Sequence, residues 1–255
     1  MDISRGSSEI RLHSPHPVAA ESGISQRVTY RLARSRSDYE GAFRILQKRY
    51  AESGLTRNPS MPMRVMPFHL WPQTQVFVAL DQDRVIGSVS LVRDEGDHGL
   101  PMESTYKEVV ERLRSQGLML AEVCCLCVGS DDKHSTGELF AGLTRIMAFH
   151  ARYVGIKSLV AVVHPRHSKF YRLAMGFSEI GGLSAYRQVG GRPGVPIQGQ
   201  FHDDSSFRGR WKRYYFAGAF AEEELRPRPM SMIDREYFRR FVENYDQTAE
   251  RRSAA

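Results

Sequence analysis

The stretch that decides the fold runs from residue 118 to residue 177 and opens with LMLAEVCCLCV (residues 118–128). This nearly continuous apolar run predicts a strand that is buried on both faces. Apolar residues at helical spacing follow from Leu139 to Val154, and a second apolar strand, LVAVV, covers residues 159–163. Because a strand–helix–strand order of this length requires a crossover, we expect the two strands to lie parallel or nearly so in one sheet.

The segments on either side of this stretch predict further strands and helices from their hydrophobic periodicity. The other predicted strands cover residues 27–33, 75–80, 85–92, 177–180 and 195–201. The other predicted helices cover residues 37–52, 102–115 and 170–175. The sequence therefore predicts an α/β protein with a mixed central sheet that is flanked by helices.

With 255 residues, the chain can bury a full core and fits one domain with appended segments. We expect a flexible tail over residues 1–26, a folded domain over 27–204, and an extension over 205–255 whose terminal helix, residues 233–248, packs on the core. The tail lacks the apolar region of a signal peptide, and no apolar run approaches the roughly 20 residues of a membrane span. We therefore expect a cytoplasmic protein without a membrane span, for which peripheral membrane contact stays open.

The chain is basic, with a formal net charge of +7 and a pI near 9.4. Such a charge favours an acidic partner, which is nucleic acid, an anionic membrane surface or an acidic carrier protein. The densest basic cluster, Arg208, Arg210, Lys212 and Arg213, is interleaved with aromatic residues, a pattern typical of nucleic-acid binding or of an ordinary exposed face. Because we recognise no nucleic-acid-binding module in the sequence, nucleic acid is the least favoured partner.

The three cysteines, Cys124, Cys125 and Cys127, lie within one apolar strand. Extended spacing points neighbouring side chains to opposite faces and suits no disulfide framework, so we expect reduced, buried thiols. A structural zinc site needs about four ligands, and the sequence has no second cysteine pair. We therefore predict no metal site.

The order of elements resembles the GNAT acyltransferase superfamily over roughly residues 28–180: strands, a glycine loop entering a helix, a second strand, then FY (170–171) and GF (176–177). Two features look closer to long-chain N-acyl amino acid synthases of the N-acyltyrosine synthase type, which are relatives of the acyl-homoserine-lactone synthases. The first is GLPME (99–103), leading through a helix to Leu113-Arg114 and AEV (121–123); the second is HPRH (164–167) before FY. The resemblance implies a GNAT fold and the transfer of an acyl group to an amine.

The phosphate loop departs from the usual GNAT pattern, Gln/Arg-x-x-Gly-x-Gly/Ala, whose backbone amides bind an anion at a helix N-terminus. The matching residues, HSTGEL (134–139), place Leu139 where a small residue would let the backbone approach phosphate, and Glu138 adds negative charge. The resemblance therefore implies an acyl-carrier-protein thioester as donor rather than coenzyme A, with no tightly bound cofactor. The predicted contacts to the phosphopantetheine arm or the carrier are Lys133, His134, Gly137 and the basic cluster at 208–213. Each of these charges alone also fits a solvated surface.

Aminolysis of a thioester needs a neutral amine, a stabilised oxyanion and a place for the departing thiolate. Glu122 lies mid-strand among apolar residues, where a carboxylate costs free energy unless it is paired or used. We predict that Glu122 takes the proton of the amine, directly or through water. The alternative is a structural salt bridge, for example with Arg166.

The oxyanion and the leaving group have candidates nearby. A backbone amide at Cys124, Cys125 or Leu126 is the predicted oxyanion contact, because GNAT strands bulge and separate there. Tyr171 matches the superfamily tyrosine that hydrogen-bonds or protonates the leaving thiolate. A core aromatic whose hydroxyl is satisfied is the alternative for Tyr171.

His164, Arg166 and His167 follow the end of the second strand, the edge where sites tend to form in α/β sheets. Arg166 fits an amino-acid carboxylate, and either histidine fits a proton relay, although histidines at strand ends are also structural caps. The irregular segment 55–73, rich in proline and methionine, fits either the wall of an acyl-chain site or plain loop packing.

Together these residues predict an enzyme that moves a long-chain acyl group from acyl-carrier protein to the amine of an amino acid or similar small acceptor by direct attack. Two alternatives remain. One is an acetyl- or acyl-coenzyme A dependent N-acetyltransferase, for which Gly137 supplies part of a phosphate loop; the other is a catalytically inactive GNAT-fold binding module. A covalent route through Cys125 and Cys127 is less favoured, because thiols in apolar surroundings have raised pKa values. The acceptor, the chain length and the oligomeric state stay open.

Overall fold

The computed structural model describes residues 28–56, 58–129, 134–202, 204–205, 207 and 209–242. Its strands are β1 (Thr29–Leu32), β2 (Thr74–Asp81), β3 (Arg84–Arg93), β4 (Leu120–Val128), β5 (Ser158–Val163), β6 (Ser178–Glu179), β7 (Ser184–Tyr186) and β8 (Arg192–Gln200). They form an eight-stranded sheet in the order β1-β2-β3-β4-β5-β8-β6, with β7 paired to β8. The pairing is antiparallel except between β4 and β5, which are parallel. The predicted parallel pair in a mixed sheet is confirmed.

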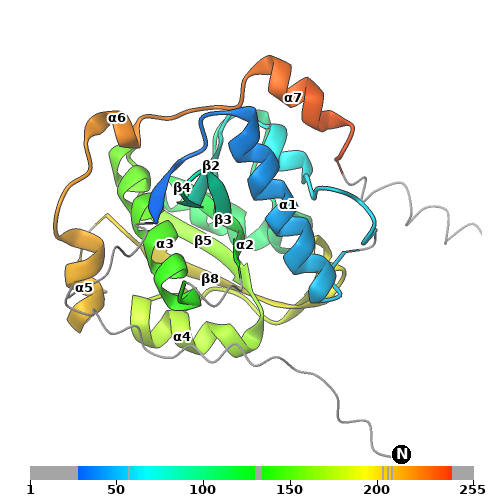
Figure 1. Ribbon diagram of the computed structural model, residues 1–255. Coiled ribbons are helices and arrows are strands. Elements are labelled where there is room, and N and C mark those ends of the chain that lie inside the picture. Colours follow the sequence, from blue (N-terminus) through cyan, green and yellow to red (C-terminus); the bar gives the residue numbers. More distant parts are fainter. Residues whose placement is uncertain are drawn as a thin grey trace, which may run out of the picture.

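Helices cover both faces of this sheet (Figure 1). They are α1 (Arg36–Glu52), α2 (Glu103–Ser115), α3 (Thr136–Tyr153), α4 (Pro165–Met175), α5 (Gly209–Phe216), α6 (Glu222–Leu225) and α7 (Met232–Arg239), with short 3-10 turns η1 (Pro67–Leu70), η2 (Gly96–His98) and η3 (Arg187–Val189). Neighbouring residues of β2 point to opposite layers, as the two-residue period of a strand requires. Phe77 packs in the core with α3, whereas Val76 and Val78 pack with Tyr39 and Phe43 of α1.

Helix α4 begins earlier than the sequence pattern indicates, at Pro165 rather than Phe170. The ring Nδ1 of His164 accepts a hydrogen bond from the backbone N–H of Arg166 at 3.3 Å and so caps the helix. Proline suits the first helical position because its missing N–H would have no partner there. The HPRH motif is therefore the start of a helix.

The C-terminal elements pack back on the domain. Phe238 of α7 is fully buried, and its ring meets Phe43 edge-on with the centroids 5.1 Å apart. The predicted terminal helix over residues 233–248 is observed as Met232–Arg239, and residues from 243 onward lie outside the described part of the chain. Within the described ranges, no helix combines the length and the apolar character needed to cross a membrane.

Candidate active site

Strand β4 contains a bulge halfway along its length. It pairs with β3 through Cys124 and next through Cys127, so residues 125–126 face a single residue of β3. The backbone of Cys125 has φ = 52°, in the left-handed region that residues other than glycine seldom adopt. A bulge leaves one residue out of the ladder, which frees backbone groups at the position predicted for the oxyanion contact.

The parallel partner of β4 also separates at this point. β4 and β5 pair only from Leu120 to Glu122, opposite Ser158 to Val160, although both strands continue beyond these residues. The sheet is therefore open between the second halves of β4 and β5. Glu122 is the last residue of β4 that pairs with β5.

Glu122 lies at a small cavity of about 60 Å³, called here the Glu122 cavity, which is also lined by Tyr50, Cys125, Tyr186 and Gln188. The Glu122 side chain is almost fully buried. Its Oε2 accepts a hydrogen bond from the backbone N–H of Met102 at 2.7 Å, and its Oε1 accepts one from the Tyr186 hydroxyl at 3.2 Å. Both contacts are with uncharged groups, so the salt bridge to Arg166 that was the structural alternative is absent.

Burial raises the pKa of Glu122 from 4.5 to about 7, because the low-dielectric interior disfavours the charged carboxylate. The hydrogen bond from Met102 is the largest opposing contribution, and those with Cys124 and Tyr186 act in the same direction. A carboxyl group with a pKa near 7 both accepts and releases a proton at neutral pH. This is the property required of a base that takes a proton from an amine.

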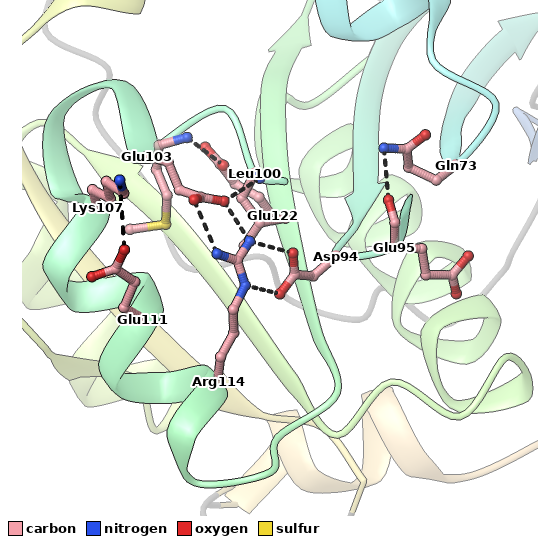
Figure 2. Close-up of polar contacts among 10 residues, drawn as sticks. Gln73, Asp94, Glu95, Leu100, Glu103, Lys107, Glu111, Arg114 and Glu122 are labelled. Atoms are coloured by element: carbon pink, nitrogen blue, oxygen red, sulfur yellow. Dashed lines mark hydrogen bonds and ion pairs between the residues drawn. The ribbon is translucent and has the colours of Figure 1, made fainter. Parts of the chain in front are cut away.

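An ion network anchors the backbone amide that contacts Glu122. Figure 2 shows Arg114 between Asp94 and Glu103. The Arg114 guanidinium donates to both oxygens of Asp94 at 2.7 and 2.6 Å and also to Glu103, while Glu103 accepts from the backbone N–H of Leu100 at 2.6 Å. These bonds fix the loop that enters α2. Its residue Met102 therefore presents its N–H to Glu122.

A glycine is required in this loop. Gly99 has φ = 65°, and a Cβ at this position would collide with the Glu103 carboxylate. Gly99, Glu103 and Arg114 all belong to the first motif that carried the family resemblance. The motif is thus explained as a scaffold for the Met102 amide and, through it, for Glu122.

A second, larger cavity of about 290 Å³ lies on the other side of β4, between β4, β5, α3 and α4. It is called here the Tyr171 cavity. Most of its lining is apolar, including Phe140, Met147, Phe170 and Phe177. Burial raises the pKa of Tyr171 to about 12, so its phenol keeps its proton at neutral pH. Tyr171 is therefore a hydrogen-bond donor inside an apolar cavity.

The two cavities meet at the bulge. Both are lined by Tyr50, Val123, Cys125 and Val162. The cavity that contains the Glu122 carboxyl group and the apolar cavity therefore share a wall at the point where the strands separate. This arrangement fits a charged reacting group on the Glu122 side and a long neutral group on the Tyr171 side.

The structure separates the two histidines of the HPRH motif from its arginine. His164 and His167 line the Tyr171 cavity, and burial followed by the charge of Arg166 lowers the pKa of both rings. Arg166 is exposed on the first turn of α4, and its Nε contacts Nε2 of His167 at 3.1 Å. The lining of both cavities, as far as the structure describes it, does not include Arg166.

Two of the predicted carrier contacts, His134 and Gly137, lie at the start of α3. Gly137 is in the first turn, and Nε2 of His134 is 3.5 Å from the Asp81 carboxylate. Lys133 and Arg208 lie outside the described residues, and Lys212 pairs with Asp204 at 3.0 Å. Leu139 is buried in the core, which weakens the argument that its side chain blocks phosphate.

The cysteines are reduced and hold their protons. Burial, the largest contribution in each case, raises the thiol pKa of Cys125 to about 12 and the thiol pKa of Cys127 to about 11. It also raises the thiol pKa of Cys124. A thiol is a poor nucleophile until it ionises. These environments favour direct attack over a covalent cysteine intermediate.

The fold and the site define a GNAT-type acyltransferase: a sheet opened between β4 and β5, with a buried carboxyl group at the opening. A family model described as N-acyl amino acid synthase FeeM matches residues 41–199, and the chain belongs to this family. The protein is therefore an N-acyltransferase, and the inactive binding module considered from the sequence is not supported.

Solved structures agree with this assignment. FeeM, an N-acyl amino acid synthase from uncultured soil microbes, is 26% identical over 71% of this chain and 95% of that chain, with a TM-score of 0.61. MesI, a CoA-dependent acyl-homoserine lactone synthase, shares the fold at 16% identity over 75% of this chain and 97% of that chain, with a TM-score of 0.54. The acyl-homoserine-lactone synthase LasI does so at 14% identity over 77% and 98%, with a TM-score of 0.53. A search of curated proteins finds no significant match.

Sequence reasoning missed several contributors to the site. Tyr186 comes from β7, a three-residue strand with no predictive pattern, and the Met102 contact uses a backbone amide. Tyr50 lies in the helix predicted over residues 37–52, and its side chain lines both cavities. Met66 of the segment 55–73 lines the Glu122 cavity, not the larger cavity that fits an acyl chain. Arg64, in the same segment, is fully buried and received no role.

Proposed function

We propose that this protein transfers a long-chain acyl group from an acyl-carrier-protein thioester to the amine of an amino acid. The observation that carries the proposal is the junction of the two cavities at the Cys125 bulge. The Glu122 side supplies a buried carboxyl group with a pKa of about 7, and the Tyr171 side supplies a larger apolar cavity. The acceptor belongs on the first side and the acyl thioester on the second.

The reaction follows from this arrangement by direct attack. The amine nitrogen bonds to the thioester carbon, and Glu122 takes the proton that the nitrogen gives up, directly or through water. Backbone amides at Cys125 and Leu126 stabilise the tetrahedral oxyanion. The C–S bond then breaks, and the Tyr171 hydroxyl donates a hydrogen bond to the departing sulfur, which leaves as the thiol once it is protonated.

His164 and His167 line the Tyr171 cavity, and their role in this proposal is to exchange that proton with solvent. Their lowered pKa values keep the rings neutral at pH 7, so each ring offers one donor and one acceptor nitrogen. This supports a relay more than it supports a contact with an anion.

Charge and the start of α3 support a carrier-protein donor. The net charge of +7 suits an acidic carrier, and the N-terminus of α3 at Ser135 to Gly137 suits the single phosphate of a phosphopantetheine arm. A coenzyme A thioester is the alternative donor, favoured by the burial of Leu139 away from the phosphate loop and by the description of MesI as CoA-dependent. The carrier-protein reaction takes place in the cytoplasm.

The donor is tested by offering the purified protein acetyl-coenzyme A, a long-chain acyl-coenzyme A and the matching acyl-carrier protein, each with a mixture of amino acids. We expect the carrier-protein thioester to be consumed fastest, with N-acyl amino acids detected by mass spectrometry. Faster use of a coenzyme A thioester would replace the proposed donor. The absence of any acyl amide from all three donors would overturn the function itself.

A further inference from the structure

A second charged group lies beside the Glu122 cavity. Arg64 has none of its surface exposed, and its backbone N–H donates to the carbonyl of Phe43 at 3.0 Å. Its Nη2 donates to the backbone carbonyl of Gln188 at 3.2 Å, and its guanidinium carbon lies 4.6 Å from the centroid of the Tyr50 ring. Tyr50 and Gln188 both line the Glu122 cavity, so Arg64 lies directly behind this wall.

The positive charge of Arg64 acts on two residues that line this cavity. It lowers the pKa of the Cys125 thiol at the bulge and that of the Tyr50 phenol, in each case against the larger effect of burial. Of the side chains described as lining the Glu122 cavity, none is cationic and only Glu122 is a carboxyl group. The carboxyl group of Glu122 in the cavity wall and the cationic guanidinium of Arg64 behind it thus carry opposite charges when Glu122 is ionised.

An α-amino acid carries its amine and its carboxylate on the same carbon. When the amine faces both Glu122 and the thioester at the bulge, the carboxylate of the same amino acid must therefore lie close to Glu122 and to the bulge. A guanidinium presents a planar set of N–H donors that matches a carboxylate, and burial strengthens such a bond. Arg64 has the charge and the planar donors for this contact and lies behind the Tyr50 and Gln188 wall, so the contact requires this wall to move aside. Arg166, by contrast, is exposed on α4.

We propose that Arg64 binds the carboxylate of the amino-acid acceptor and so makes the enzyme select amino acids over simple amines. This inference rests on the proposed N-acyl transfer to an amino acid. Glu122 and Arg64 then recognise the two ends of the acceptor's zwitterion. The segment 55–73, which also contributes Met66 to the Glu122 cavity, becomes a determinant of acceptor specificity.

The test compares two acceptors that differ only by the carboxylate, such as tyrosine and tyramine. For the wild-type protein, we expect kcat/KM to be about 10- to 100-fold higher with the amino acid, the range of a hydrogen bond to a charged group. Arg64→Gln should remove most of this preference, through a loss with tyrosine and little change with tyramine. Arg64→Lys, which keeps the charge without the planar donors, should retain part of it.

Arg152→Gln is the matched control. Arg152 also donates to a backbone carbonyl, that of Tyr215 at 2.8 Å, and lies over an aromatic ring, that of Phe149, but it is remote from the Glu122 cavity. This control should leave the tyrosine-to-tyramine ratio unchanged. Circular dichroism melting of each variant shows whether it folds, and activity with tyramine shows that the acyl transfer still works.

Three results would overturn the role of Arg64. The first is a wild-type enzyme that does not prefer tyrosine over tyramine. The second is a folded Arg64→Gln variant whose activity falls equally with both acceptors. The third is an Arg166→Gln variant that loses the preference for tyrosine while Arg64→Gln keeps it. If Arg64→Gln fails to fold, an Arg64→Lys variant with the full wild-type ratio counts against the proposal. Failure of every acceptor with wild-type protein would instead contradict the acyl transfer itself.

Discussion

The two cavities on either side of β4 differ in what they can hold. The Glu122 cavity is small, and a carboxyl group with hydrogen bonds from Met102 and Tyr186 lies in its wall. The Tyr171 cavity is several times larger and is mostly apolar, with a neutral phenol as its donor. The proposed function therefore assigns proton transfer to the Glu122 cavity and the binding of a neutral acyl chain to the Tyr171 cavity. Substitutions in each wall test this division.

The largest effect is expected at Glu122. Because Glu122→Gln cannot accept a proton, we expect kcat/KM to fall by about 10²- to 10⁴-fold, the usual contribution of a general base. In the wild type, kcat/KM should rise with pH through about 7 as Glu122 ionises, and this limb should vanish in the variant. Glu111→Gln, at an exposed glutamate of α2, is the control. An unchanged pH limb in Glu122→Gln would assign the base to another residue.

The same carboxyl group makes stability depend on pH. Its folded pKa of about 7 exceeds the ordinary value of 4.5, so the folded state binds more protons between these pH values, and its stability falls as pH rises through them. The loss is on the order of 3 kcal/mol and is complete above pH 7. Urea unfolding at pH 4.5, 6 and 8 should show it in the wild type relative to Glu122→Gln. A constant difference between the two proteins across this range would mean that Glu122 is not buried as described.

On the other side of β4, filling the cavity should change the chain length that is used. Ala161 of β5 is buried and lines the Tyr171 cavity. Ala161→Phe should lower kcat/KM for long-chain thioesters by roughly 10- to 100-fold and leave short chains nearly unchanged, and Ala161→Val should do so less. Rates measured across a series of acyl lengths check this. An equal loss at every length, with an unchanged melting temperature, would place the acyl chain elsewhere.

A smaller effect is expected at Tyr186. Tyr186→Phe removes one of the hydrogen bonds that favour ionised Glu122, so the Glu122 pKa should rise further and the pH limb should move upward by about one unit. Activity at pH 7 should then fall about fivefold and recover at higher pH. The control is Tyr106→Phe, which removes a buried hydrogen bond to the Gly194 carbonyl instead. Equal pH profiles for the two variants would exclude a role for Tyr186 at Glu122.

These sites also show what the sequence can and cannot predict. The strands and the crossover follow from local apolar patterns, and Glu122 stands out because a lone carboxylate in an apolar strand is costly. Its partners Met102 and Tyr186 are 20 and 64 residues away in sequence, so their proximity depends on the folded sheet. The early start of α4 was missed because His164, a residue outside the common set of caps, caps it with a ring nitrogen.

The smallest effect is expected from the cysteines at the junction of the cavities. Cys125 lines both cavities, but burial keeps the thiols of Cys125 and Cys127 protonated at neutral pH. The double substitution Cys125→Ala and Cys127→Ala should keep kcat/KM within about threefold of the wild type, because direct attack needs no thiolate. Alanine and cysteine both carry a Cβ, so the left-handed backbone at Cys125 is strained equally in both proteins. Loss of turnover in a folded double variant, together with an acylated wild-type protein in mass spectrometry, would replace direct attack with a covalent intermediate at the bulge.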